Sequence, residues 1–265
     1  MITLTATPIP RTLNMALSGI RDLSVMNTAP RDRLPIRTTV IPFDQDVIKD
    51  AIERELDRNG QIFFIHNRVQ TIEKMTKRLQ AVIPNASFYI AHGQMPEKEL
   101  EKIILDFYHN KFDVLVCTTI MENGVDIPNV NTIIINHADR FGLAELYQLR
   151  GRIGRSNHQA YAYLIMPEHT TAEAKKRLEI IEETDALGSG FKIAMRDLEM
   201  RGVGNILGTK QHGIMNAIGY NYYNKLLERA IDKYRQSMNY DYDIFEEEKS
   251  RTSIICTFPH YIPGT

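Results

Sequence analysis

Short apolar runs alternate with amphipathic segments over the first 165 residues of the chain. The apolar runs are rich in β-branched and aromatic residues, as in Gln61 to Ile65, which is typical of buried strands. Between two such runs, Val47, Ile48 and Ile52 recur at helical spacing. The predicted strands cover residues 38–41, 61–65, 87–91, 112–117, 131–136 and 160–166, and the predicted helices cover 44–58, 69–82, 96–110 and 142–150. This alternation predicts an α/β fold of right-handed βαβ units with a mostly parallel sheet.

The pattern changes after Met166 and Pro167, where strands give way to helices. Helical segments are predicted at residues 172–186, 193–200 and 218–238. A glycine-rich stretch, residues 202–213, separates the last two. Residues 3–5 and 252–258 resemble strands that have no evident partner nearby. We therefore interpret the chain as a piece of a longer protein.

Composition restricts the class of protein without naming it. The 265 residues are 43% hydrophobic and 25% charged, which is ordinary for a soluble globular protein and argues against disorder or a coiled coil. The net charge is −1, with residues 239–265 at −3 and the rest at +2. That balance neither requires nor excludes a nucleic-acid partner, because binding depends on where the charge lies.

Two distant cysteines, Cys117 and Cys256, make a disulfide framework or a thiolate zinc site improbable. Four histidines, His66, His92, His109 and His137, also lack metal-ligand spacing, so hydrogen-bonded or surface roles are the better interpretation. The sequence shows neither a signal peptide nor a long apolar span. We expect no bound metal in this chain and a cytoplasmic location.

Residues 148–155, Gln-Leu-Arg-Gly-Arg-Ile-Gly-Arg, are the stretch richest in candidate chemistry. Arg150, Arg152 and Arg155 lie within six positions and have no acid beside them, which predicts a concentrated positive site. Guanidinium groups match phosphate oxygens bidentately and do not lose their charge. A solvated surface run is the alternative. It is disfavoured because these arginines lie between a predicted helix and a predicted buried strand.

A second candidate follows the predicted strand at residues 112–117. That strand ends in the two hydroxyls of Thr118 and Thr119, and the loop then carries Gly124 and Asp126. Ligands of open α/β sheets gather at the carboxyl ends of strands, where hydroxyl and backbone N–H groups suit phosphate. A helix cap is an equally good interpretation of the threonines when they are taken alone.

Taken together, these stretches resemble the second motor lobe of the superfamily two helicases and translocases. Thr5 to Pro8 is similar to motif III of that superfamily, and residues 62–69 to motif IV. His92 to Met95 is similar to the element that contacts the nucleic-acid backbone. Residues 118–128 and 148–155 are similar to motifs V and VI. The motifs follow one another in the family's order along nearly the whole chain, which makes the resemblance specific.

Residues 196–208, with Gln211 and Gly213, resemble the translocation motif shared by two kinds of double-stranded DNA motor. These are the fork-remodelling helicases of the RecG type and the transcription-repair coupling factors. His212 stands where a serine is more usual. A dinucleotide fingerprint is excluded because the preceding segment is helical. Residues 3–25, residues 137–163 and the acidic tail favour the coupling factors.

The resemblance implies a RecA-like fold with four regions. Residues 1–27 would be a remnant of the first motor lobe, 28–167 the second lobe, 168–238 a helical translocation-motif region, and 239–265 an acidic linker that opens a further domain. ATP and Mg²⁺ would be bound mainly by the first lobe, because the sequence has neither G-x-x-x-x-G-K-[ST] nor D-E-x-H. We therefore expect no ATPase activity from this chain alone.

The same resemblance implies roles for individual residues. Arg152 and Arg155 would act as arginine fingers with Gln148 beside them, and Gly124 and Asp126 would border ATP. Contacts to the backbone of double-stranded DNA would come from Arg68, His92, Gly93, Thr118 and Thr119. Coupling of ATP to movement would involve Thr5, Thr7, Arg196, Arg201 and Gln211.

RNA polymerase and an excision-repair damage-recognition protein would be partners through domains outside this chain, and no membrane partner is expected. Two alternatives remain: a fork-remodelling helicase, and a non-catalytic interaction module with a RecA-like fold. The intact arginines and glycines of residues 148–155 disfavour the second alternative.

Overall fold

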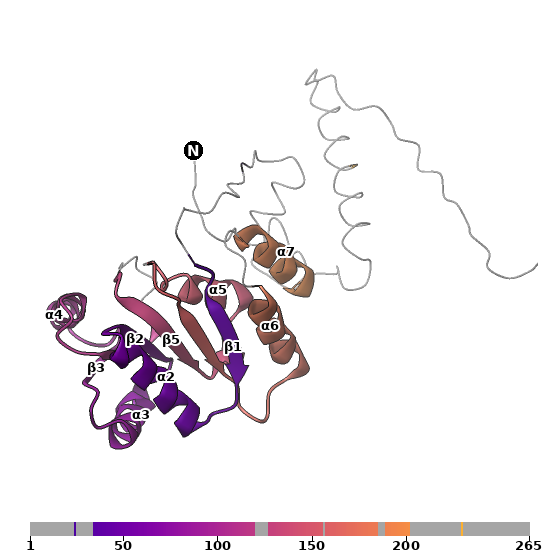
Figure 1. The fold of residues 1–265 in the computed structure, drawn as a ribbon. Helices are drawn as coiled ribbons and strands as arrows, with labels where there is room; N and C mark the ends of the chain where they lie inside the picture. Colours follow the sequence, from indigo (N-terminus) through magenta and orange to yellow (C-terminus); the bar gives the residue numbers. More distant parts are fainter. Residues whose placement is uncertain are drawn as a thin grey trace, which may run out of the picture. The chain divides into compact units, whose positions relative to one another are not determined.

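The computed structural model describes residue 24, residues 34–119, 127–155, 157–184 and 189–201, and residue 229. The chain divides into two compact units, Met1–Tyr220 and Asn221–Thr265, and only Arg229 of the second unit is described. The elements of the first unit are β1 (Arg37–Ile41), α2 (Gln45–Asp57), β2 (Gln61–His66), α3 (Val69–Val82), β3 (Phe88–Ala91), α4 (Glu97–Tyr108), β4 (Val114–Cys117), β5 (Val130–Asn136), the 3₁₀ turn η2 (Ala138–Arg140), α5 (Leu143–Arg150), β6 (Tyr161–Ile165), α6 (Ala172–Glu183) and α7 (Gly190–Arg201) (Figure 1).

The described strands form one six-stranded sheet in the order β1-β6-β5-β2-β4-β3. Every neighbouring pair is parallel, so all strands begin at one end of the sheet and finish at the other. The predicted α/β class and the mostly parallel sheet are confirmed.

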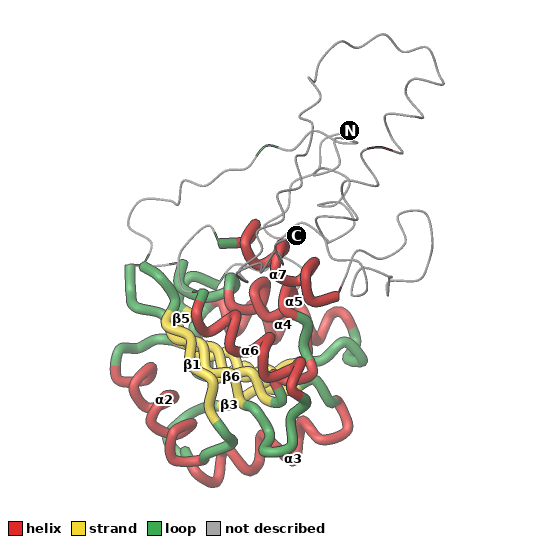
Figure 2. The backbone as a smooth tube through the Cα atoms, turned by 90° about the vertical axis from the view of Figure 1, so that its right-hand side faces the viewer, coloured by secondary structure: helices red, strands yellow, loops and turns green. Residues whose placement is uncertain are grey.

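The sheet is the middle layer between two helical layers (Figure 2). Alternate residues of β2 divide between two apolar clusters, because successive side chains of a strand point to opposite faces. Ile62 and Phe64 pack with α2 and α3 in one cluster. Phe63 and Ile65 pack with α4, α5, α6 and α7 in the other. Both faces of β2 are therefore buried, which explains its continuous apolar sequence.

Several predicted boundaries are wrong by one to three residues, and local hydrogen bonds explain the shifts. Asp44 caps α2 rather than joining it, because its carboxylate accepts from the Asp46 N–H at 2.9 Å. Asp113 accepts from both the N–H and the hydroxyl of Ser87, so these two residues link the loop ahead of β4 to the loop ahead of β3. Helix α6 ends at Glu183, where the Thr184 hydroxyl donates to Ile180 O at 2.6 Å.

Helix α7 covers more of the chain than the predicted 193–200 and packs against α5. The predicted strands at residues 3–5 and 252–258, the glycine-rich stretch at 202–213 and, apart from Arg229, the helix at 218–238 lie outside the described residues. No described helix is long and apolar enough to cross a membrane.

Candidate functional site

The carboxyl ends of three neighbouring strands, β3, β4 and β2, bring together the residues predicted to contact DNA. Ala91 pairs with Cys117, and Cys117 with Ile65, so the residues that follow these strands lie side by side. The Thr118 N–H donates to Ala91 O at 3.3 Å, which continues the ladder one residue past the strands. His92 and Gly93 follow Ala91, and Thr119 follows Thr118. The structure therefore places these four residues at one end of the sheet.

Arg68 reaches the same end from β2. It is the N-cap of α3, with an extended backbone, and its side chain is exposed. Arg68 therefore stands where the chain turns from the sheet into the helix. All five predicted DNA-contacting residues thus lie at the carboxyl ends of adjacent strands.

His66 is held in place at this end by two hydrogen bonds. Asn136 Nδ2 lies 2.9 Å from His66 Nδ1, and His66 Nε2 lies 2.8 Å from the Thr71 hydroxyl. With the Asn136 amide donating, the ring carries its proton on Nε2. Burial lowers the pKa of His66, and the nearby His137 and Arg68 lower it further. His66 is therefore a neutral, hydrogen-bonded histidine, as its sequence setting predicted.

Residues 151–155 lie at the opposite end of the sheet, where the strands begin. The Gly154 N–H donates to Val130 O, the first residue of β5, at 3.4 Å. Gly154 has a φ of +67°, and a Cβ there would lie 2.8 Å from the Cβ of Ala160, just before β6. This close approach requires glycine. Arg155, next along the chain, is exposed, and Arg152 is half-buried.

The prediction of a positive site made of three arginines is wrong at Arg150. Its side chain is only 5% exposed, and its Nη1 donates to Ile181 O at 2.9 Å and to the Thr38 hydroxyl at 3.3 Å. Its guanidinium also lies 5.1 Å from the Tyr147 ring centroid. Arg150 thus joins α5 to α6 and β1, and the exposed positive charge reduces to Arg152 and Arg155.

The remaining predicted residues are only partly described. Gln148 is exposed on α5, Arg196 is exposed on α7, and Arg201 is the last residue of α7. The other predicted positions lie outside the described residues: Thr5, Thr7, Gly124, Asp126 and Gln211.

Sequence reasoning missed a second group of residues at the carboxyl ends of β2 and β5. His137 and Arg140 line a small hollow with Arg68, beside the buried pair His66 and Asn136. The available signal was the polar run from Asn136 to Arg140, which directly follows an apolar strand.

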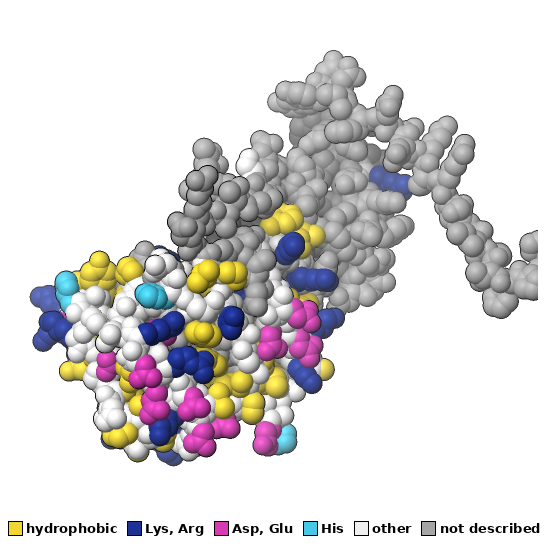
Figure 3. Space-filling view, in the orientation of Figure 1, with side chains coloured by type: hydrophobic (Ala, Val, Ile, Leu, Met, Phe, Trp, Pro, Cys, Tyr) yellow, Lys and Arg dark blue, Asp and Glu magenta, His cyan; other side chains and the backbone are white. Residues whose placement is uncertain are grey.

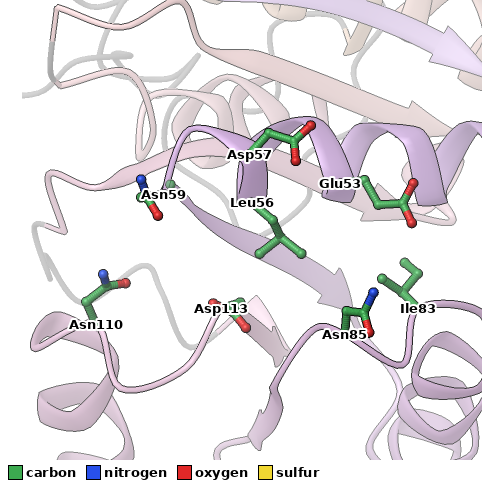
Figure 4. A pocket seen from close by; sticks show the side chains of 9 residues that line it. Glu53, Leu56, Asp57, Asn59, Ile83, Asn85, Asn110 and Asp113 are labelled. Carbon is green, nitrogen blue, oxygen red and sulfur yellow. The ribbon is translucent and has the colours of Figure 1, made fainter.

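The larger described cavity, of about 450 Å³, is separate from all of these residues. It opens beside the start of β2, and its lining comes from α2 and from the loops that precede β2, β3 and β4 (Figure 4). Its charged lining consists of the carboxylates of Glu53, Asp57 and Asp113. Negative charge repels phosphate, so this cavity suits neither ATP nor DNA. Within the described ranges no group of acidic, histidine or cysteine side chains is arranged to hold a metal ion.

The visible surface of the lobe mixes acidic and basic side chains rather than presenting one sign (Figure 3). This agrees with the nearly balanced net charge of −1. Contacts to an anionic partner must therefore come from local groups such as those at the strand ends.

Known proteins that resemble this chain indicate the class of protein to which it is similar. Residues 45–157 match the family described as helicase conserved C-terminal domain. A structure of RecG bound to a three-way DNA junction superimposes with a TM-score of 0.64 and 32% sequence identity, covering 84% of this chain and 30% of RecG. A more distant structure, of Dbp5 from S. cerevisiae, shares the fold, with a TM-score of 0.50 at 17% identity over 74% of this chain and 54% of that one. The described lobe thus has a RecA-like helicase fold, and its residues 45–157 are similar to the helicase conserved C-terminal domain.

The more particular resemblance is to the transcription-repair-coupling factor. The protein of that name from Staphylococcus aureus (strain USA300) is 52% identical over 237 residues, which is 89% of this chain and 20% of that protein. The Staphylococcus haemolyticus protein is equally similar. The chain thus spans about a fifth of the length of these relatives, and the resemblance to the motor lobe of the coupling factors is confirmed.

Proposed function

We propose that this chain is the second motor lobe, with its translocation region, of an ATP-driven double-stranded DNA translocase. The motor displaces stalled RNA polymerase and couples transcription to nucleotide-excision repair. The observation that carries this proposal is the 52% identity to a transcription-repair-coupling factor over 89% of the chain. RNA polymerase and the excision-repair damage-recognition protein bind through parts of the motor outside this chain, and the motor acts in the cytoplasm.

ATP chemistry belongs to the end of the sheet where the strands begin. Arg152 and Arg155 reach the phosphates of ATP held by a first motor lobe, and Gln148 supports the same network. A guanidinium so placed stabilises the charge that develops on the transferring phosphoryl group, and such a finger is worth roughly 10³ to 10⁵ in rate. Gly124 and Asp126 border the nucleotide in this proposal. The tight turn at Gly154, with its φ of +67°, supports it by fixing the backbone immediately before Arg155.

DNA contact belongs to the opposite end of the sheet. Arg68, His92, Gly93, Thr118 and Thr119 lie at the carboxyl ends of β2, β3 and β4, where hydroxyl, backbone N–H and guanidinium groups suit phosphate oxygens. Such contacts fix the position of the lobe on a duplex and carry little sequence information. Binding by this chain alone is therefore weak, non-specific and sensitive to salt.

Coupling between the two ends passes through the helical region. Helix α7 packs against α5, and α5 leads directly into the arginine-bearing residues 151–155. Arg196 and Arg201 lie on α7. We assign them, with Gln211, Thr5 and Thr7, to the transmission of nucleotide state to DNA movement.

ATP and Mg²⁺ are held mainly by the first lobe. The described carboxylates of this chain offer no metal-binding group, whereas Arg152 and Arg155 fit phosphate. The sequence has no phosphate-cradling G-x-x-x-x-G-K-[ST] loop. This chain alone is therefore inactive as an ATPase.

A fork-remodelling helicase is the second candidate, favoured by the 0.64 TM-score with RecG. The full-length protein distinguishes the two in paired assays on one preparation. The proposed function predicts ATP-dependent release of a stalled polymerase from duplex DNA and little remodelling of a three-way junction. Junction remodelling without polymerase release would replace the proposal with the second candidate.

A further inference from the structure

Strands β2 and β5 are neighbours whose chains leave the sheet toward opposite faces. After β2 the chain enters α3, which packs in the apolar cluster that contains Ile72 and Leu79. After β5 it enters η2 and α5, which pack in the cluster that contains Leu143 and Leu146. Such a switch point leaves a crevice at the carboxyl ends of the two strands, and it is where open α/β sheets bind ligands.

The crevice between β2 and β5 is present as a hollow of about 40 Å³. Its lining includes Arg68 and Asn67 from the β2 side and His137 and Arg140 from the β5 side. A volume of this size has room for roughly two or three water molecules, or one small oxyanion. The hollow is therefore too small for a nucleoside and suits a single phosphate group.

Two guanidinium groups at this hollow have no partner among the described residues. Neither Arg68 nor Arg140 donates a side-chain hydrogen bond or forms an ion pair within the described part of the chain. Four other described arginines are engaged, namely Arg54 by Tyr163, Arg58 by Glu55, Arg78 by Phe43 and Arg177 by Glu173, whereas Arg37, at the beginning of β1, also lacks a described side-chain partner. Arg68 and Arg140 are also exposed, so their donors are available to an anion.

His137 lines the same hollow as the two arginines and is held in an unusual backbone conformation. Its φ of 55° and ψ of 50° are left-handed, which non-glycine residues adopt sparsely and mostly where the surrounding structure requires it. Its Nδ1 is buried without a hydrogen-bond partner in the described structure, 3.9 Å from Asp139 Oδ1, which is equally unpartnered. Burial lowers the pKa of His137, and Arg140 and Arg68 lower it while Asp139 raises it. The charged groups around the ring are thus two cations and one carboxylate.

The floor of the hollow is rigid. His66 is fixed between Asn136 and Thr71, and it is 4% exposed. Because both of its ring nitrogens are occupied, His66 shapes the hollow rather than binding the ligand. A ligand that enters the hollow therefore meets a preformed surface.

We propose that Arg68, Arg140 and His137 form a pocket that holds one backbone phosphate of double-stranded DNA. This inference rests on the proposed function and adds Arg140 and His137 to its DNA-contacting surface. The pocket lies at the same end of the sheet as Thr118 and His92, away from Arg152 and Arg155, which favours DNA over ATP as the source of the phosphate. The carboxyl ends of the strands from β3 to β5 span roughly 14 Å, which is the length of about four base pairs along a DNA duplex.

The test measures binding of this chain to a DNA duplex over a range of salt concentrations. Arg140→Gln removes one charge and keeps the length of the side chain, and Arg140→Lys keeps the charge. Arg37→Gln is the matched control, because Arg37 is exposed at the beginning of β1, at the other end of the sheet. The unfolding midpoint of each variant confirms an intact fold.

We expect Arg140→Gln to weaken binding several-fold and to reduce the slope of log K against log salt by about 0.9, which corresponds to one lost phosphate contact. Arg140→Lys should stay close to the wild-type slope, and Arg37→Gln should equal the wild type. If the wild type binds with a salt-dependent affinity that Arg140→Gln leaves unchanged, the pocket is wrong and the proposed function stands. If the wild type shows no salt-dependent binding, both are wrong.

A second arm identifies the source of the phosphate. The full-length protein carrying Arg140→Gln is titrated with ATP at saturating DNA, and the chain is titrated with inorganic phosphate. The inference predicts an unchanged KM for ATP and weaker binding of inorganic phosphate by the Arg140→Gln chain than by the wild-type chain. A raised KM with an unchanged DNA slope would assign the pocket to the nucleotide and overturn the inference.

Discussion

Arg150 donates a hydrogen bond from Nη1 to the carbonyl oxygen of Ile181 at 2.9 Å, across 31 positions of sequence. The same nitrogen lies 3.3 Å from the Thr38 hydroxyl. One guanidinium therefore holds together the end of α5, the helix α6 and the strand β1. Arg152 and Arg155, which follow it, are more exposed and remain candidates for ATP chemistry.

Arg150→Ala should destabilise the chain, because it leaves the buried Ile181 carbonyl unsatisfied and removes a charge-assisted hydrogen bond. We expect the free energy of unfolding to fall by roughly 2–3 kcal/mol. Arg155→Ala, on an exposed side chain, should change it by no more than about 0.5 kcal/mol. Chemical denaturation of both variants measures this. Equal stabilities for the two would show that Arg150 is not a structural residue.

Gly154→Ala should destabilise the chain much more than Gly151→Ala. At Gly154 the φ is +67° and the added Cβ would lie 2.8 Å from the Cβ of Ala160. Left-handed backbone costs about 1–2 kcal/mol and overpacking about 1–3 kcal/mol. At Gly151 the nearest atom lies 3.3 Å away and the φ is negative. Thermal unfolding of the pair measures the difference. A similar melting temperature for both variants would contradict the tight turn.

The stability of the chain should fall as the pH drops below about 6.5, partly because of His66. Burial, His137 and Arg68 lower the pKa of His66 below 6.5 in the folded state. The unfolded state therefore binds more protons in this range, so stability is fully present above pH 6.5 and is lost as the pH falls toward the folded-state pKa. Replacing His66 with Gln should flatten the dependence of the unfolding free energy on pH. An unchanged slope would mean that other groups control it.

Much of the fold could be predicted from the sequence because it depends on local periodicity. The continuous apolar run of β2 results from its burial on both faces, and the helical repeat of α2 results from its packing against one face of the sheet. The predicted elements within the described residues therefore agree with the structure to within a few residues. Boundaries shifted where a side chain bonded to the backbone, as at Asp44 and Asp113. Hydrogen bonds from such side chains compete with those of the helix or strand, and the pattern of apolar residues along the sequence does not reveal them.

The site was less predictable because it depends on contacts between distant segments. The grouping of Arg150 with Arg152 and Arg155 was wrong, since the carbonyl that engages Arg150 comes from α6. The pair His66 and Asn136 is 70 positions apart and becomes visible only through the register of β2 and β5. Strand order, rather than spacing, brings Arg68 and Arg140 to one hollow.

Arg201→Ala and Gln211→Ala should uncouple the full-length motor. In the proposed function neither residue reaches the phosphates of ATP, so ATP turnover on DNA remains appreciable while displacement of a stalled polymerase fails. Arg155→Ala should lose both activities together. ATPase and displacement assays on the same preparations check this. If all three variants abolish ATP hydrolysis equally, the translocation motif has to be assigned to the ATP site or to the fold of the lobe.

In the proposed function, opposite ends of one parallel sheet serve ATP chemistry and DNA contact. The most direct measurement is the ATPase rate of the full-length protein as duplex DNA is titrated, for Arg155→Ala and Arg68→Ala. We predict that Arg155→Ala lowers the maximal rate by roughly 10³-fold or more with little change in the half-saturating DNA concentration. Arg68→Ala should raise that concentration and approach the wild-type maximal rate. A loss of maximal rate in both variants, with the same DNA dependence, would contradict the separation.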